Sequence, residues 1–130
     1  SAATTLLAAA ARANYSMPPD HGAAIVQTVM QNPELQADWD AELKEVRDRI
    51  NSLRSLLVTS LRAGGLEQDF SFIEREKGMF SFLGVNKDQI QTLINDYSIY
   101  LVGSSRINVA SINDNNLHYL VDSVAAVLKS

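Results

Sequence analysis

Residues 33–65 read PELQADWDAELKEVRDRINSLRSLLVTSLRAGG, and this stretch predicts one long helix. Asn32 is a good N-cap, Pro33 suits the first helical position, and Gly64–Gly65 is a typical end signal. At about 1.5 Å per residue the helix would span roughly 45 Å, so we expect it to bridge two domains. Its apolar residues recur in the steps of three and four that mark one helical face: Leu35, Trp39, Leu43, Val46, Ile50, Leu53, Leu57 and Leu61.

Composition is that of an ordinary globular protein and excludes several kinds of site. The chain has 130 residues, of which 46% are hydrophobic and 20% charged, and its net charge is −4. Its basic residues are scattered among acids, so we expect no nucleic-acid partner. No stretch has the length of a membrane span, and there is no cysteine for a disulfide or a thiolate site. His21 and His118 stand far apart in the sequence, so we expect no metal site.

Two shorter helices are predicted before the long one. Residues 2–13 are rich in alanine and leucine, which favour helix. Pro18 and Pro19 end this helix, because proline lacks an amide donor and disfavours the α region for the preceding residue. Asp20 is placed to cap a helix over residues 21–31. We expect its apolar residues to face inward: Ile25, Val26, Val29 and Met30.

After Gly65 the pattern changes to short alternating stretches. Residues 70–73 (FSFI) and 79–83 (MFSFL) alternate aromatic with small polar residues, which predicts a half-buried hairpin. Residues 99–102 and 106–110 are apolar enough to form two further strands. These stretches, together with the helices, predict an α+β fold with a small, mostly antiparallel sheet covered by helices.

Two more helices are predicted around these strands. Asn86 and Gln89 have the spacing of a capping box for a helix over residues 87–97. Asn113 or Asp114 would begin a final helix. The inward residues of both helices follow the helical period: Ile90, Leu93, Ile94, Tyr97, Leu117, Leu120, Val121, Val124 and Leu128.

Arg106 is the strongest candidate for a functional residue. It follows the turn Gly103-Ser104-Ser105 within an apolar stretch. A guanidinium stays protonated, so burying it requires an anionic partner, and its fork matches a carboxylate or phosphate through two parallel hydrogen bonds. An internal ion pair with one of the 15 acidic residues explains Arg106 equally well. Both interpretations stay open at this point.

Three further residues have ordinary interpretations on sequence alone. Arg12 ends the alanine-rich helix, where a basic residue favours the helix dipole. Phe80 lies in a predicted strand, where an aromatic residue usually packs, and Ser16 precedes a proline-rich turn. No nucleophile with its base, no glycine-rich phosphate loop and no pair of catalytic carboxylates can be assembled.

Four stretches together resemble one family. They are RANYSMPPDHGA (12–23), WDAELKEVRDRI (39–50), DFSFIEREKGMFSFLG (69–84) and YLVGSSRINVAS (100–111). In this order and at these separations they resemble the C-terminal third of the bacterial aspartate and aromatic amino-acid aminotransferases. Those enzymes are fold-type-I proteins that depend on pyridoxal 5′-phosphate. The resemblance implies a homodimeric, cytoplasmic parent enzyme whose substrates are amino acids and 2-oxo acids.

The resemblance also implies roles for four residues. Arg106 would bind the α-carboxylate of the amino-acid substrate, and Phe80 would line the substrate pocket. Arg12 would reach into the partner subunit's active site and bind the distal carboxylate of dicarboxylic substrates. Ser16 would belong to the same connector between subunits.

The resemblance places the cofactor-binding residues upstream of this chain. None of its lysines (Lys44, Lys77, Lys87 and Lys129) falls at the position of the family's Schiff-base lysine. We therefore expect no catalytic residue and no bound pyridoxal phosphate in this chain, which would be inactive alone. Residues 1–32 would close the large cofactor-binding domain, 33–63 form the bridging helix, and 64–130 form the mobile small domain.

Two alternatives to an aminotransferase remain open. The chain could be a non-catalytic α+β module in which Arg106 binds a small carboxylate. It could also be a purely structural domain in which Arg106 forms an internal ion pair. A solvent-reachable Arg106 without an acidic neighbour would favour the aminotransferase or the binding module over the structural domain.

Overall fold

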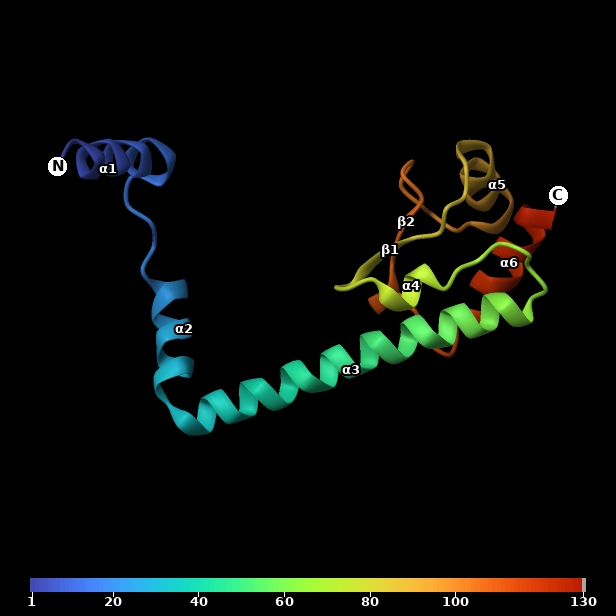
Figure 1. Ribbon diagram of the computed structural model, residues 1–130, viewed down its shortest axis with the longest axis horizontal. Helices are drawn as coiled ribbons and strands as arrows, with labels where there is room; N and C mark the ends of the chain where they lie inside the picture. Colours follow the sequence, from blue (N-terminus) through green and yellow to red (C-terminus); the bar gives the residue numbers. More distant parts are fainter. Residues whose placement is uncertain (130) are drawn as a thin grey trace. The chain divides into compact units, whose positions relative to one another are not determined.

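The computed structural model describes residues 1–129, which fold mainly into helices with one small antiparallel sheet (Figure 1). This part of the chain forms two compact units, Ser1–Leu43 and Lys44 onward, which divide within the long helix and are described separately. The elements in chain order are α1 (Ala2–Tyr15), α2 (His21–Gln31), α3 (Pro33–Ala63), α4 (Phe72–Arg75), β1 (Phe80–Phe82), α5 (Lys87–Tyr97), β2 (Arg106–Asn108), the 3₁₀ helix η1 (Val109–Ser111) and α6 (Leu117–Lys129).

The first unit has the predicted helices but not the predicted core. Helix α2 spans the predicted residues, and Asp20 precedes it without a side-chain capping bond. Ile25, Val26 and Met30 are exposed, so the prediction that they face inward is wrong for this unit. Within residues 1–129, neither α1 nor α2 contains a buried residue, so the described chain offers the apolar face of α2 nothing to pack against.

Helix α3 has the predicted bounds and is buried only in its second half. The Asn32 Oδ1 atom accepts hydrogen bonds from the amides of Glu34 (2.9 Å) and Leu35 (3.2 Å), which caps the helix. Gly65 follows the helix with a φ of 71°, a conformation that glycine adopts without strain. The predicted apolar stripe is exposed through Val46, and only its later members enter the core.

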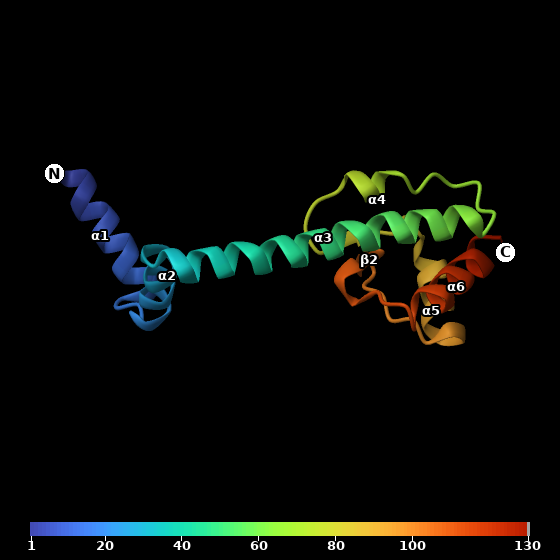
Figure 2. The same ribbon diagram turned by 90° about the horizontal axis from the view of Figure 1, so that it is seen from below.

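The second unit packs its helices and sheet around one hydrophobic core. Figure 2 shows the segment that carries α4 along one side of α3, with β2, α5 and α6 on the other side. No helix among residues 1–129 is long and apolar enough to cross a membrane. The core combines residues from α3, α4, α5, α6, η1 and β2 with others from the connecting segments: Leu57, Val58, Leu61, Phe70, Ile73, Leu83, Val85, Ile90, Leu93, Ile107, Val109, Ile112, Leu117, Val121, Val124 and Val127.

The two predicted helices of this unit are present. Helix α5 has the predicted bounds, and both bonds of the Asn86–Gln89 capping box are formed. Helix α6 begins at Leu117 rather than at Asn113 or Asp114. The Asn113 and Asn116 side chains accept hydrogen bonds from nearby backbone amides, and such bonds compete with helix formation.

The predicted strands are partly wrong. Residues 70–73 do not pair with 79–83; residues 72–75 form α4, and β1 pairs antiparallel with β2. Asp69 bonds the amide and hydroxyl of Ser71, which turns the chain before α4 and overrides the alternating pattern. Residues 99–102 form no strand, because the amide of Ile99 bonds the carbonyl of Leu93 and closes the end of α5.

Asp69 is expected to make the stability of the second unit depend on acid pH. The bonds from the Ser71 amide and hydroxyl lower the pKa of Asp69 below the ordinary value. A lowered folded-state pKa stabilises the fold above the unfolded-state pKa, and this contribution is lost as the pH falls through the folded value. Urea unfolding is therefore expected to show a wild-type advantage over Asp69→Asn that is constant above about pH 5 and shrinks below about pH 4. An advantage that grows on acidification would contradict this.

Candidate functional site

The pairing of β1 with β2 places three large side chains on one face of the sheet. The register sets Phe80 opposite Asn108, Ser81 opposite Ile107 and Phe82 opposite Arg106. Side chains alternate between faces along a strand, so Phe80, Phe82 and Arg106 share the outward face while Ser81 and Ile107 are buried. Arg106 is thus directly opposite Phe82 and diagonal to Phe80.

Arg106 stacks on the diagonal aromatic ring, and its donors form no hydrogen bond with residues 1–129. Its Cζ atom lies 4.5 Å from the centre of the Phe80 ring, a cation–π contact. The residue is exposed, and no carboxylate of residues 1–129 forms an ion pair with it. The planar fork can therefore receive an external carboxylate or phosphate. The alternative in which Arg106 forms an internal ion pair is therefore not supported by residues 1–129.

The turn before Arg106 is held in place by the hydrogen bonds of Ser105. Ser105 is buried with a φ of 66°, and its hydroxyl oxygen accepts a hydrogen bond from the amide of Val85 (3.1 Å). Its carbonyl accepts a bond from the amide of Leu83 (2.9 Å), and its own amide donates to the carbonyl of Val102 (2.9 Å). Ser105 thereby ties the start of β2 to the residues that follow β1, which sets the position of Arg106.

A cavity of about 380 Å³ opens beside Arg106 and Phe80. Its lining is largely apolar, with a few amides and hydroxyls that could orient a ligand. This is the composition of a typical small-molecule site. The polar lining residues besides Arg106 are Tyr100, Asn108, Ser111, Asn116 and Tyr119, none of which was predicted from the sequence as a site residue.

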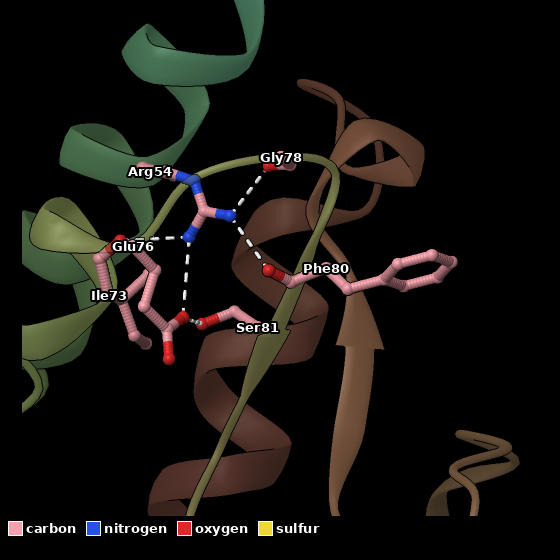
Figure 3. A network of polar contacts seen from close by, with 6 residues as sticks. All are labelled: Arg54, Ile73, Glu76, Gly78, Phe80 and Ser81. Carbon is pink, nitrogen blue, oxygen red and sulfur yellow. Dashed lines mark hydrogen bonds and ion pairs between the residues drawn. The ribbon is translucent and has the colours of Figure 1, made fainter.

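A buried arginine, Arg54, binds the backbone of the segment that leads into β1 and carries Phe80. Arg54 is 1% exposed; its Nη1 donates to the carbonyl of Ile73 (2.8 Å), and its Nη2 donates to the carbonyls of Gly78 and Phe80 (2.7 Å each). Glu76 lies 3.5 Å from Nη1 and accepts a short hydrogen bond from the Ser81 hydroxyl (Figure 3).

Arg54 was missed by the sequence analysis, although a signal was present. It stands four residues after Ile50 and three before Leu57, within the stripe that predicts the core face of α3. A charged residue on such a face indicates either that the helix prediction is wrong or that the charged group is buried with partners. The bounds of α3 are correct, so the second interpretation holds.

Arg12 and Ser16 lie in the first unit, and both are exposed. Arg12 is in the last turn of α1, and its carbonyl accepts a hydrogen bond from the amide of Ser16 (3.1 Å). Ser16 has a φ of 55°, which turns the chain out of the helix before Pro18. The structure therefore joins Arg106 with Phe80, and it joins Arg12 with Ser16.

Comparison with known proteins identifies the family. The model of the family described as aminotransferase class I and II matches residues 1–124. This chain is a class I and II aminotransferase sequence. The aspartate aminotransferase of Pseudomonas aeruginosa is 45% identical over 117 residues, and the aromatic-amino-acid aminotransferase of Paracoccus denitrificans is 44% identical over 116. These matches include 90% and 89% of this chain but only 29% of each relative, so the chain spans under a third of their length.

Solved aminotransferase structures share the fold of this chain. The aromatic-amino-acid aminotransferase of Burkholderia pseudomallei, described as covalently bound to pyridoxal phosphate, superposes with a TM-score of 0.84 at 49% identity. It covers 90% of this aminotransferase chain, which in turn covers 29% of that structure. Both the aspartate and the aromatic branches of the family are therefore among its relatives, and the resemblance inferred from the four sequence stretches is confirmed.

Proposed function

We propose that this chain is the C-terminal part of an aspartate or aromatic amino-acid aminotransferase, in which Arg106 binds the α-carboxylate of the substrate. The parent enzyme would transfer an amino group between an aromatic or dicarboxylic amino acid and a 2-oxo acid. The observation that carries this proposal is the guanidinium of Arg106, which forms no ion pair with residues 1–129 and stacks on Phe80 beside an open cavity. A planar fork with free donors suits two parallel bonds to a carboxylate.

The roles of Phe80, Arg12 and Ser16 extend this proposal. The Phe80 ring is 44% exposed beside the cavity, which supports a role as an apolar wall for the substrate. Arg12 is exposed at the end of α1, which supports its use as a cation presented to another subunit. In a homodimer, Arg12 would meet the distal carboxylate of a dicarboxylic substrate, and Ser16 would fix the connector that presents it.

The cofactor belongs to the parent enzyme in this proposal. Pyridoxal phosphate supplies an electron sink when bound to a lysine. The described part of this chain does not fit the cofactor on its own, because no lysine lines the cavity. Lys44 pairs with Asp48 (2.7 Å), and Lys129 donates to the carbonyl of Gly64 (2.8 Å). The cofactor's lysine would lie upstream of this chain. Residues 1–32 would close the cofactor-binding domain, residues 33–63 would form the bridging helix, and residues 64–130 would form the small domain. The parent enzyme would be cytoplasmic.

The 130-residue chain alone is expected to form no stoichiometric covalent adduct with pyridoxal phosphate. After incubation with the cofactor and reduction with borohydride, mass spectrometry is expected to detect no stoichiometric modification of one lysine. Scattered, substoichiometric labelling of exposed lysines is the expected background. A single fully modified lysine would contradict the placement of the cofactor's lysine upstream.

Transamination by the full-length protein tests the proposed function directly. The assay pairs aspartate, tyrosine and phenylalanine in turn with 2-oxoglutarate and measures the new 2-oxo acid. Transfer from at least one donor is expected; no transfer from any donor would reject the proposal. The alternative, a carboxylate-binding module, is tested by calorimetric titration of the 130-residue chain with 3-phenylpropionate. Saturable binding together with an inactive full-length protein would favour that alternative.

Replacing Arg12 by leucine is expected to impair dicarboxylic substrates selectively. Loss of one charge-assisted bond is expected to lower kcat/KM for aspartate by about 10-fold or more and leave phenylalanine within about 2-fold. Steady-state kinetics of the full-length variant with both amino acids provide the test. Equal losses for aspartate and phenylalanine would show that Arg12 supports the fold or the dimer rather than the distal carboxylate.

A further inference from the structure

The guanidinium of Arg54 binds a single short stretch of chain. Its three short hydrogen bonds go to the carbonyls of Ile73, Gly78 and Phe80, so they span the connection from α4 to β1. Its Nε atom is buried without a partner among residues 1–129, and Glu76 is only a distant counter-ion at 3.5 Å. Backbone carbonyls therefore satisfy most of this buried cation, and the segment they belong to ends at Phe80.

Strand β1 has one paired edge among residues 1–129, and Arg54 occupies the other. The amide of Val109 donates to the carbonyl of Met79 (2.8 Å), and the amide of Leu83 donates to that of Ser105 (2.9 Å). Hydrogen-bonded and non-hydrogen-bonded pairs alternate in an antiparallel ladder, so Phe80 and Asn108 form a non-hydrogen-bonded pair. The Phe80 carbonyl therefore points away from β2, and Arg54 supplies the donor that a third strand would otherwise provide.

The same bond orients the backbone of Phe80, from which the ring extends. Figure 3 shows the Phe80 carbonyl directed at Arg54 while its side chain extends away from the cluster. The backbone on either side is also held: Gly78, at a φ of 79°, accepts from Arg54, and the Ser81 hydroxyl donates to Glu76. With its backbone fixed from residue 78 to residue 81, Phe80 presents its ring to Arg106 at 4.5 Å.

We propose that Arg54 is a positioning residue for the carboxylate-binding site at Arg106. Arg54 acts by holding the Phe80 ring against the guanidinium of Arg106. Arg54 does not touch the ligand. It fixes the backbone of β1, the backbone fixes the ring, and the ring restricts the orientation of Arg106. This series of contacts from Arg54 through Phe80 to Arg106 is a property of the fold. Its consequence for the amino-acid substrate rests on the proposed function.

The series of contacts from Arg54 through Phe80 to Arg106 is tested by NMR on the 130-residue protein. The probes are the Arg106 δ-methylene protons, which the ring current of Phe80 displaces upfield, and Phe80→Leu defines zero displacement. Arg54→Met is expected to lose at least half of the wild-type displacement. Arg49→Met is the matched control, because Arg49 also lies on α3 and donates to backbone carbonyls, those of Ala110 and Ile112. This control is expected to retain the full displacement.

Arg54→Lys keeps the experiment decisive if Arg54→Met does not fold. One ammonium group cannot reproduce the three-carbonyl fork, so a folded Arg54→Lys protein is also expected to lose at least half of the displacement. Full displacement in either folded variant would overturn the inference. Equal losses in Arg54→Lys and Arg49→Met would also overturn it, because the effect would then be a general loosening of the fold.

The consequence for substrate is tested by a double-mutant cycle in the full-length enzyme. Arg54→Lys is expected to lower kcat/KM about 2- to 30-fold, mainly through KM, which is the range of one cation–π contact. In the Phe80→Leu background it is expected to cause no further loss, because the ring through which it acts is gone. Additive losses would assign Arg54 to general stability. An inactive wild type would reject the proposed function and leave the NMR result standing.

Discussion

Replacement of Arg106 by lysine is expected to lower kcat/KM of the full-length aminotransferase by about 30-fold or more for every amino acid. Lysine keeps the positive charge but offers a single ammonium, so the two parallel bonds to a carboxylate are lost. Loss of one partner of a desolvated charged pair costs about 2–5 kcal/mol, and the cation–π contact with Phe80 is weakened as well. The loss is expected to be the same for aspartate and phenylalanine, since both carry an α-carboxylate.

Steady-state kinetics with both donors measure this effect, and Arg62→Lys is the matched control. Arg62 is also an exposed arginine of the second unit, and it does not line the cavity beside Arg106. The control is expected to stay within about 2-fold of wild type. An Arg106→Lys enzyme as active as this control would refute the assignment of the α-carboxylate to Arg106.

Replacement of Leu57 by alanine is expected to destabilise the 130-residue chain by about 2–5 kcal/mol. Leu57 is 0% exposed in the core of the second unit, whereas its neighbour Leu56 on the same helix is 42% exposed. Leu56→Ala removes the same atoms from the same helix, so it controls for helix propensity and is expected to change stability by about 0.5 kcal/mol or less. Urea unfolding followed by circular dichroism compares the two variants, and equal losses would contradict the buried face assigned to α3.

Sequence reasoning predicted the elements whose signals are local. Helix α3 has a cap, a proline, a regular apolar stripe and a glycine end, and its predicted bounds are those observed. Helix α5 has a capping box, and its bounds are also as predicted. In both helices every signal is contained within the element and its adjoining residues, so no tertiary contact was needed to interpret it.

The predicted strands failed where a local hydrogen bond competed with the alternating pattern. Asp69 and Ser71 form a turn that leads into α4, where alternation alone predicted a strand. Ser98 adopts a left-handed conformation, and the bond from Ile99 to Leu93 then closes α5. These capping and turn signals span only a few residues, and they outweigh apolar patterns of similar length.

The candidate site was predictable in part. Arg106 was identified by its turn and its apolar surroundings, and Phe80 and Arg12 were assigned roles through the family resemblance. The contact between Arg106 and Phe80 depends on the register of β1 with β2, which the hairpin prediction had wrong. The position of Arg54 on the apolar face of α3 was visible in the sequence, but its partners were not, because its acceptors are backbone carbonyls 19 to 26 residues further along the chain.

The stacking of Arg106 on Phe80 has a thermodynamic consequence for any ligand that Arg106 receives. Ordering a long, flexible side chain costs about 1.5–2 kcal/mol in rotamer entropy, and a freely rotating surface arginine incurs that loss when its ligand arrives. Here the aromatic ring already limits the orientations of the guanidinium during folding. Anion capture at this position therefore begins from a preorganised receptor and sacrifices less configurational freedom.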